Sequence, residues 1–350
     1  MARRDTHDII VIGASMGGVE ALQRLVARFP KDLPATVCVV LHLPTGYRSK
    51  LPEILSRSGP VPASHPEDGE PLRPGCIYVA PSDRHLLVEP GRVRVVRGPR
   101  ENNHRPAVDP LFRSAALAYG ARVVGVVLTG ALNCGTSGLM AIKSQGGVAV
   151  VQEPTDAYCA DMPRSALEYV AADYCMPLTE IGGLLDRLAR TPIDTSRKRR
   201  PYRMLEQEVG SQLSYPDAID KPPENGNPSH FSCPDCGGVL FELSEEGLLR
   251  FRCRVGHDYT AEALGEGQQS SVDAALWAAV RALEERAALA RRLVARAREH
   301  KQSISLTRFE AQAREAEQHV LLLRQVALGT LSLPSAPPPK DPEGPEEPST

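Results

Sequence analysis

The sequence predicts an α/β fold: a doubly wound, mainly parallel sheet with an antiparallel hairpin, followed by a small cysteine-rich knuckle and an α-helical hairpin. Short apolar runs alternate with amphipathic stretches over residues 8–192. Two of these runs, 37–41 and 123–128, hold no polar residue, as expected of strands that helices cover on both faces. A close cysteine pair and two heptad-patterned stretches come only after this region. The chain therefore divides into an α/β part and a smaller carboxyl-terminal part.

Five strands are predicted for the parallel sheet, because each is an apolar run bounded by turn residues. They are residues 9–12, 36–42, 76–80, 123–129 and 148–152. Residues 86–89 and 93–96, separated by Pro90-Gly91, predict an antiparallel hairpin added to that sheet. Sites in such sheets lie beyond the carboxyl ends of the strands, so polar residues that follow these runs are the first candidates for chemistry.

The composition changes after residue 192 and sets the remaining boundaries. The predicted segments are the α/β domain 1–192, a linker 193–229, the knuckle 230–265, a helical hairpin 270–330 and a disordered tail 331–350. The linker is rich in Pro, Asp, Asn and Gly, with one short helix predicted near 204–212. Apolar residues at alternating steps of four and three predict the hairpin; a dimerising coiled coil and an ordinary bundle core remain alternatives.

The knuckle carries two close pairs of metal-ligand residues. Cys233 and Cys236 have two residues between them, Cys253 and His257 have three, and sixteen residues separate the pairs. Three thiolates and one imidazole suit a tetrahedral Zn²⁺ with no open position. The alternative is four reduced side chains without a metal. We predict a structural Zn²⁺ site, with a protein-facing role because the segment has no strong basic stripe for DNA.

Composition bounds the partners and the compartment. The net charge is −2, which gives no electrostatic case for nucleic acid or a membrane surface. The chain has no run of about 18 apolar residues, so no membrane-inserted helix is expected. Its charged start lacks the apolar core of a signal peptide. Five of the cysteines are scattered, as reduced core cysteines would be. We therefore expect a cytoplasmic protein.

The segment from Gly13 to Gly17 predicts a nucleophile at Ser15. An apolar run ends in Gly-Ala-Ser-Met-Gly, and an amphipathic stretch follows at once. Glycines on either side of the serine allow a sharp strand-to-helix turn that exposes the hydroxyl, as in a nucleophile elbow. Free N–H groups at the helix start would favour a developing negative charge there. A phosphate-cradling turn of a nucleotide-binding module and a plain strand–helix connection are the alternatives.

A nucleophilic serine needs a base, and His42 is the leading candidate. It ends an apolar run just before Leu43-Pro44, so it lies at the sheet edge where Ser15 lies if the two strands are parallel. His85 and His104 are rivals. His85 follows a turn and is better interpreted as structural, whereas His104 lies in a polar loop that could line a pocket.

Several motifs in order show that the chain resembles the catalytic domain of the chemotaxis protein-glutamate methylesterases (CheB). They are Ile12-Gly-Ala-Ser-Met-Gly-Gly18, Leu41-His-Leu-Pro44, Pro74-Gly-Cys-Ile-Tyr-Val-Ala-Pro81 with Asp83-Arg-His85, His104-Arg-Pro-Ala-Val-Asp109, Leu128-Thr-Gly130, Gly135 and Met162-Pro163-Arg164. The resemblance covers about half of the chain, from residue 9 to 187. It implies that Ser15 is the nucleophile and His42 the base. It also implies hydrolysis of methyl esters on glutamates of methyl-accepting chemotaxis receptors, often with deamidation of receptor glutamines.

The third triad position departs from the family pattern. The family places an aspartate after Leu-Thr-Gly, just before a glycine, and this chain has Cys134 there. Losing such a carboxylate can cost about 10⁴-fold, or about 5.5 kcal/mol of barrier. Asn133, a Cys134 thiolate, Asp109 or Asp161 could orient His42 instead. Replacing Cys134 by Asp should raise the rate, and no gain would mean that another group already orients His42.

The remaining expectations concern the oxyanion and the partners. Backbone N–H groups at Met16 and at Ala131, after Gly130, are expected to hold the oxyanion, and no cofactor is expected for catalysis. We expect a form without an amino-terminal receiver domain, whose helical hairpin contacts other chemosensory proteins. The alternative function is a catalytically impaired or inactive chemosensory adaptor, because Cys134 replaces the aspartate.

Overall fold

The computed structural model of the chain describes residues 6–43, 49–194, 205–213, 226–245 and 247–330. The predicted disordered tail 331–350 and the linker stretches 195–204 and 214–225 lie outside these residues. The chain forms two compact units, Met1–Gly267 and Gln268–Thr350. The first unit contains every candidate residue for chemistry or metal binding.

The first unit is built on a seven-stranded sheet in the order β3-β4-β2-β1-β7-β8-β9, in which all neighbours pair in parallel. Its strands are β1 (Ile9–Ala14), β2 (Thr36–Leu41), β3 (Ala63–Ser64), β4 (Cys76–Val79), β7 (Val123–Val127), β8 (Val148–Gln152) and β9 (Tyr174–Met176). The predicted parallel sheet and its five predicted strands are confirmed. The two short edge strands, β3 and β9, were not expected, since they carry too few residues to show a pattern.

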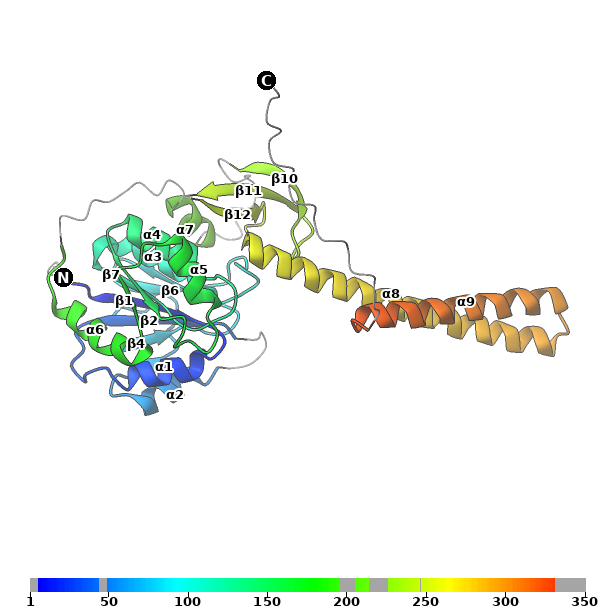
Figure 1. Cartoon of the computed structure of the whole chain (residues 1–350), viewed down its shortest axis with the longest axis horizontal. Helices are drawn as coiled ribbons and strands as arrows, with labels where there is room; N and C mark the ends of the chain where they lie inside the picture. The colour runs from blue at the N-terminus through cyan, green and yellow to red at the C-terminus, as the bar shows by residue number, and fades with distance from the viewer. Residues whose placement is uncertain (1–5, 44–48, 195–204, 214–225, 246, 331–350) are drawn as a thin grey trace, which may run out of the picture. The chain divides into compact units, whose positions relative to one another are not determined.

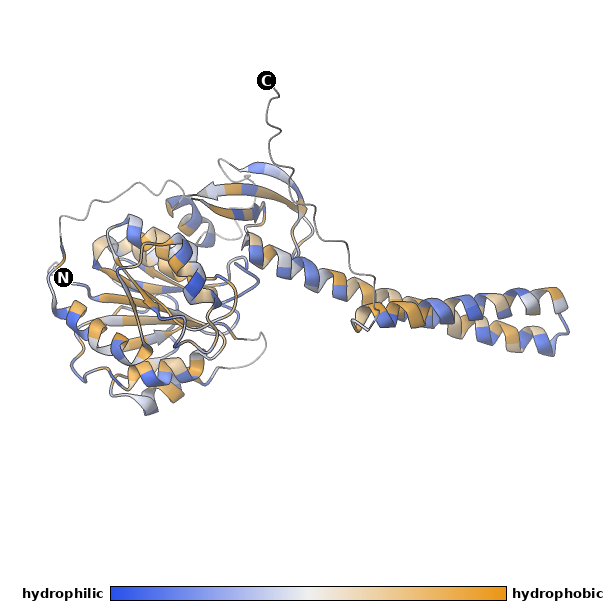
Figure 2. Cartoon of the chain, viewed as in Figure 1, coloured by the Kyte–Doolittle hydropathy of each residue, from blue (hydrophilic) through white to orange (hydrophobic). Residues whose placement is uncertain are grey.

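Helices cover both faces of this sheet (Figure 1). One face is covered by α1 (Gly18–Val26), α2 (Leu51–Ser58) and α6 (Leu178–Arg190), and the other by α3 (Val108–Tyr119), α4 (Thr136–Ser144) and α5 (Asp161–Tyr169). The short helix η1 (Gly120–Arg122) links α3 to β7. Side chains of β1 alternate between the two cores, with Ile10 and Ile12 in one and Ile9 and Val11 in the other. Figure 2 shows the resulting apolar strands at the centre of the unit.

The antiparallel hairpin forms where it was predicted but not as part of the main sheet. Strands β5 (His85–Glu89) and β6 (Arg92–Val96) form a separate two-stranded sheet, which pairs with no other strand of the described chain. The reason is its packing against α3: Ser114 Oγ accepts a hydrogen bond of 3.0 Å from the Val88 N–H. Leu86 and Leu87 are buried in the same core as α3. The hairpin therefore covers a helix rather than extending a sheet edge.

The carboxyl-terminal part of the first unit is a four-stranded antiparallel sheet, here called the ribbon. It consists of β10 (Asn227–Ser232), β11 (Val239–Glu245), β12 (Leu248–Cys253) and β13 (Asp258–Thr260). The ribbon has a small core of its own, formed by Leu240, Phe251, Tyr259 and Leu264 with two cysteines. Helix α7 (Leu205–Leu213), which matches the short helix predicted in the linker, packs against α3.

The second unit is a helical hairpin. Helix α8 (Ala261–Glu299) begins in the first unit, and α9 (Ser303–Ala327) follows after a short connection. The buried residues at the predicted heptad positions are Val280, Ala287, Ala290, Ala297, Ala313 and Ala316, and their small side chains favour close helix packing. In the part of the chain that the structure describes, no helix is both long and apolar enough to cross a bilayer.

Candidate functional site

Ser15 lies on the turn between β1 and α1, at the carboxyl edge of the sheet. The Ser15 N–H donates to the Thr129 carbonyl at 2.9 Å, which joins this turn to the segment after β7. Gly17 has a φ of 74°, a left-handed conformation that suits glycine, and a Cβ there would lie 2.6 Å from the Cβ of Tyr158. Glycine at position 17 therefore lets the chain turn into the helix while the serine hydroxyl stays accessible.

His42 lies directly beside Ser15 because their strands are neighbours in register. Ala14 of β1 pairs with Leu41 of β2, so the next residue of each strand leaves the sheet at the same point. The Oγ of Ser15 is 3.2 Å from Nδ1 of His42. That distance suits proton transfer from a serine hydroxyl to an imidazole.

In the described part of the chain, the second ring nitrogen of His42 has no carboxylate partner. Nε2 is buried, and no hydrogen-bond partner for it occurs among the described residues. The ring instead stacks on His104, with the ring centroids 3.6 Å apart and the planes 16° from parallel. Burial, and then the proximity of His104, hold the pKa of His42 well below its usual 6.5. Burial, and then Arg100, lower the pKa of His104 to about 4. Both rings are therefore neutral at neutral pH.

Cys134, predicted to stand where the family has an aspartate, is fully buried and makes no contact with His42 in the described structure. Its Sγ accepts a hydrogen bond of 3.3 Å from the Val108 N–H. Burial, and then the carboxylate of Asp109, raise the pKa of the Cys134 thiol well above its usual value, so no thiolate forms at neutral pH.

The other proposed partners of His42 are also engaged elsewhere. Asn133 donates from Nδ2 to Glu262 at 2.5 Å, and its Oδ1 accepts from the Thr260 hydroxyl at 2.7 Å. Asp109 accepts N–H groups at the start of α4, from Gly135 at 3.0 Å and Gly138 at 2.7 Å. Asp161, the first residue of α5, accepts a contact of 3.6 Å from the Cys159 thiol. Where the structure is described, none of them contacts His42.

The segment after β7 lies close to Ser15. A Cβ on Gly130 would lie 2.8 Å from the Cβ of Ser15, so only glycine allows this approach. The Thr129 hydroxyl donates to the Met16 carbonyl at 2.8 Å and accepts the Cys159 N–H at 2.8 Å. For the N–H groups of Met16 and Ala131, no backbone acceptor is recorded among the described residues. Thr129, which belongs to the Leu128-Thr-Gly130 motif but was given no role from the sequence, joins the turn of Ser15 to residue 159.

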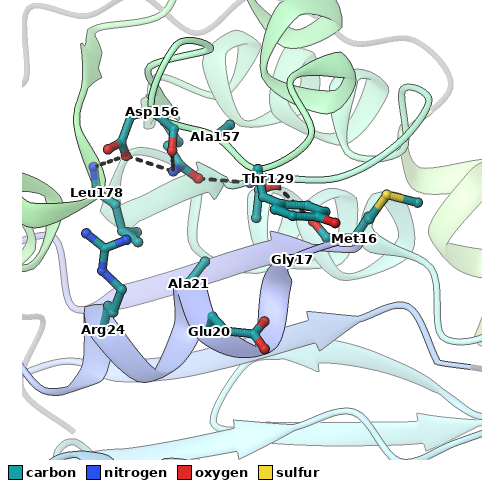
Figure 3. A pocket seen from close by; sticks show the side chains of 11 residues that line it. Met16, Gly17, Glu20, Ala21, Arg24, Thr129, Asp156, Ala157 and Leu178 are labelled. Carbon is teal, nitrogen blue, oxygen red and sulfur yellow. Dashed lines mark hydrogen bonds between the residues drawn. The ribbon is translucent and has the colours of Figure 1, made fainter.

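Two hollows flank the serine. One, of about 370 Å³, is lined by Ser15, His42, Leu43, Arg100, Asn103, His104 and Arg105. The other, of about 720 Å³, lies along the first turns of α1 and is bordered by Met16, Glu20, Arg24, Asp156 and Tyr158 (Figure 3). Met16 and Tyr158 are 53% and 80% exposed, which leaves apolar surface next to the serine.

His85 is a structural residue rather than a member of the site, as interpreted from the sequence. The ring is fully buried; its Nδ1 lies 3.3 Å from the Ala107 N–H and its Nε2 lies 2.8 Å from the Pro99 carbonyl. Ala107 donates, so Nε2 carries the proton that Pro99 accepts. Burial lowers the pKa of His85 to about 4, and it joins two loops as a neutral ring.

Cys233, Cys236, Cys253 and His257 come together in the ribbon as a cluster that could hold a metal ion. The Sγ atoms of Cys236 and Cys253 are 3.7 Å apart, and Nδ1 of His257 lies 3.6 Å from Cys233 Sγ and 3.5 Å from Cys253 Sγ. A tetrahedron with Zn–S bonds of about 2.3 Å and Zn–N bonds of about 2.0 Å has edges of about 3.5–3.8 Å. The spacing of the ligand atoms fits such a tetrahedron.

Comparisons with known proteins show what the α/β part of the chain is similar to. The sequence profile of the CheB methylesterase family matches residues 10–185. A protein-glutamate methylesterase/protein-glutamine glutaminase of Anaeromyxobacter dehalogenans is 38% identical over 189 residues, which are 54% of this chain and 55% of that relative. A relative from Leptospira interrogans is 35% identical over 189 residues, 54% of this chain and 98% of its own. The chain therefore spans about half the length of the first relative and nearly all of the second.

A solved structure extends the likeness to the fold. The crystal structure of the Thermotoga maritima CheB methylesterase catalytic domain has 34% sequence identity and a TM-score of 0.50. The match covers 52% of this chain and 98% of that chain. The profile match ends before the ribbon begins.

Proposed function

Because the chain belongs to the CheB methylesterase family, we propose that it hydrolyses glutamate methyl esters on methyl-accepting chemotaxis receptors and deamidates receptor glutamines. The observation that carries the proposal is the 3.2 Å contact between the Ser15 hydroxyl and His42 Nδ1 at the carboxyl edge of the sheet. The names of the relatives, which join methylesterase and glutaminase, favour the same two substrates.

In the proposed mechanism, Ser15 Oγ attacks the ester carbonyl carbon while His42 Nδ1 accepts the hydroxyl proton. Because its pKa lies below 6.5, His42 is unprotonated and ready to act as the base at neutral pH. The tetrahedral intermediate collapses as His42 gives the proton to the methoxy group, and methanol leaves. Water then attacks the acyl-serine with the same base, which regenerates Ser15 and yields the glutamate carboxylate. With a glutamine substrate, ammonia leaves instead of methanol.

The oxyanion and the rest of the substrate are proposed to contact different groups of the site. The N–H groups of Met16 and Ala131 are proposed to donate to the oxyanion, since both adjoin the segments that meet at Ser15. We propose that the substrate segment crosses the sheet edge from the hollow beside Tyr158 to the hollow beside Arg100 and Arg105.

The second candidate is a receptor-binding adaptor with little or no activity. It is favoured by one observation: Nε2 of His42 has no carboxylate partner in the described structure, and Cys134 lies against Val108 instead. A serine-directed phosphonate separates the two functions, because it modifies only a serine that a base activates. The hydrolase predicts a covalent adduct on Ser15, slowed strongly in His42→Ala and absent in Ser15→Ala. An unmodified Ser15 in the folded wild type would favour the adaptor.

We also propose that the cysteine–histidine cluster of the ribbon holds a structural Zn²⁺. Its four ligand atoms lie within 4.8 Å of one another, and their spacing fits a tetrahedron with no open position. Such a metal would supply folding energy rather than chemistry, because four protein ligands leave no place for substrate. We propose no cofactor for the reaction itself.

The proposed compartment rests on the cysteines, and the proposed partners rest on exposed side chains of the helical hairpin. None of the eight cysteines forms a disulfide, which is typical of proteins in a reducing compartment, so we place the protein in the cytoplasm. The helical hairpin exposes Leu289, Ile304 and Leu321. We propose that it contacts other chemosensory proteins through these side chains.

A further inference from the structure

Among the described residues, no carboxylate contacts the catalytic histidine of the proposed mechanism, so we expect another group to fix its ring. In serine hydrolases that role falls to an aspartate on the second ring nitrogen. Here the face of the His42 ring stacks on the ring of His104, with 3.6 Å between the two ring centroids. The position of His104 therefore decides the position of His42.

His104 is presented by a tight turn whose shape is unusual. Asn102 and Asn103 have φ values of 50° and 66°, so two successive residues adopt the left-handed conformation. The turn is closed by a hydrogen bond of 2.9 Å from the His104 N–H to the Glu101 carbonyl. Asparagine is among the residues that tolerate this backbone best, but the conformation still needs support from its surroundings.

That support comes from the segment that ends the ribbon and starts α8. The Asn102 N–H donates to the Asp258 carbonyl at 2.8 Å, and Asn102 Oδ1 accepts the Thr260 N–H at 2.9 Å. Asn103 Nδ2 donates to the Ala263 carbonyl at 2.8 Å. Asn102 and Thr260 are only 5% and 2% exposed, so water cannot replace these bonds.

The same segment also holds the other side of the site. The Thr260 hydroxyl donates to Asn133 at 2.7 Å, in the loop that carries Ala131. Asn102 Nδ2 donates to Asp109 at 3.1 Å, and Asp109 in turn accepts the Gly135 N–H. Residues 258–263 thus join the turn of His104 to the loop after β7.

We propose that residues 258–263, at the end of the ribbon, orient His42, and that Asn102 is the positioning residue through which they act. By fixing the turn that carries His104, Asn102 holds the His104 ring against His42. This stack orients the His42 imidazole in place of the missing aspartate. The inference rests on the proposed hydrolase function and deepens it: the ribbon is a working part of the esterase although it lies outside the family's matched region.

Replacing Asn102 by Gly tests the proposal. Glycine accepts a φ of 50°, so the backbone can keep its shape while both side-chain bonds are lost. We expect kcat for methanol release to fall between about 10-fold and 100-fold with KM nearly unchanged, since small errors in the placement of a catalytic group cost that much. Lys301→Gly is the matched control: Lys301 has a φ of 54° in the connection between α8 and α9, far along the chain from the site.

The pH–rate profile gives a readout that a purely structural role would not move. His104 is the titratable group that acts on His42, and Arg100 is the charged group that acts on His104. Both burial and His104 lower the pKa of His42, so release of the stack raises that pKa toward 6.5. The acid limb of kcat/KM, which marks loss of the neutral base, therefore moves to higher pH in Asn102→Gly and stays in place in Lys301→Gly.

Two further measurements keep the outcome unambiguous. Asn103→Gly loosens the same turn through a different bond and should shift kcat and the acid limb in the same directions. The imidazole proton signals of His42 and His104 in NMR spectra report the stack without substrate, and should lose their mutual ring-current shifts in both variants. Folded Asn102→Gly with wild-type kcat, acid limb and ring signals would overturn this inference alone. A wild type without Ser15-dependent methanol release would overturn the proposed function instead.

Discussion

At the residue scale, the candidate site works through burial and neighbours rather than through a charged triad. Ser15 contacts a neutral His42, and the pKa of that imidazole is lowered by burial and by His104. The side chain that occupies the family's aspartate position, Cys134, is a buried thiol directed at the Val108 N–H. A stacked ring rather than a carboxylate therefore orients the base, and this changes the expected effect of a carboxylate at position 134.

Replacing Cys134 by Asp should leave kcat within a few-fold of the wild type. From the motif alone a rate increase is expected, but the structure places Cys134 against Val108 and Asp109, and the ribbon already orients His42. A carboxylate–imidazole contact can raise kcat by up to about 10⁴-fold. The measurement is kcat per phosphonate-reactive site, and a gain of about 10-fold or more would contradict the orientation of His42 by His104. Cys134→Ala, which removes the thiol without adding charge, is the control and should also keep its activity.

At the element scale, the secondary structure of each segment was easier to predict from the sequence than its contacts with other segments. The parallel strands, the cysteine–histidine cluster and the helical seam follow from periodicity and spacing, which are local properties. The Asn102 turn and its bonds to Thr260 could not be predicted, because they join residues 158 positions apart and depend on two left-handed backbone conformations. The placement of Ser15 beside His42 was predictable only because parallel neighbours end at one edge.

Loss of one ligand should remove the metal from the ribbon. Cys236→Ser leaves three ligands, and we expect the zinc content measured by plasma mass spectrometry to fall from about one ion per chain to near zero after dialysis, since structural zinc sites require four ligands. Amide hydrogen exchange in β11 and β12 should rise at the same time, because the ribbon core is small. Cys175→Ser changes an exposed cysteine of β9 and should keep its zinc. Full zinc in Cys236→Ser would contradict the assignment.

At the scale of the whole first unit, a buried network of charges joins the α/β domain, α7 and the ribbon. Glu208 of α7 is fully buried, 3.1 Å from Arg113 of α3 and 2.7 Å from Arg250 of β12. Arg250 also pairs with Asp258 of β13 at 2.8 Å, and Arg113 pairs with Glu101. Burial alone would raise the pKa of Glu208, but Arg250 and Arg113 outweigh it and lower that pKa. Two members of the network adjoin Asn102: Glu101 precedes it in the chain, and the Asp258 carbonyl accepts its N–H.

Replacing Glu208 by Gln should destabilise the first unit strongly. Removal of one partner from a buried ion-pair network leaves an excess charge, here one positive charge shared by Arg113 and Arg250, and typically costs about 3–5 kcal/mol. The measurement is the free energy of unfolding from urea titrations of the wild type and the variant. Glu206→Gln, on the exposed side of the same helix, should change that free energy by no more than about 0.5 kcal/mol. Equal stability of the two variants would show that the network contributes nothing.

The sign of the pH dependence follows from the same carboxylate. Because the folded-state pKa of Glu208 lies below its ordinary value, its contribution is present above about pH 4.3 and is lost as the pH falls through the folded-state pKa. The stability difference between the wild type and Glu208→Gln should therefore shrink on acidification. The motifs could not reveal this network, since a buried glutamate in a linker helix resembles a solvent-exposed one in sequence.

The most direct test of the central claim is methanol release from methylated chemoreceptor by the full chain and by Ser15→Ala. The account predicts steady release by the wild type, with one receptor carboxylate appearing for each methanol, and no release above the uncatalysed background by the variant. Equal release by the two proteins, or none by the folded wild type, would contradict the proposal that Ser15 and His42 form a working hydrolase.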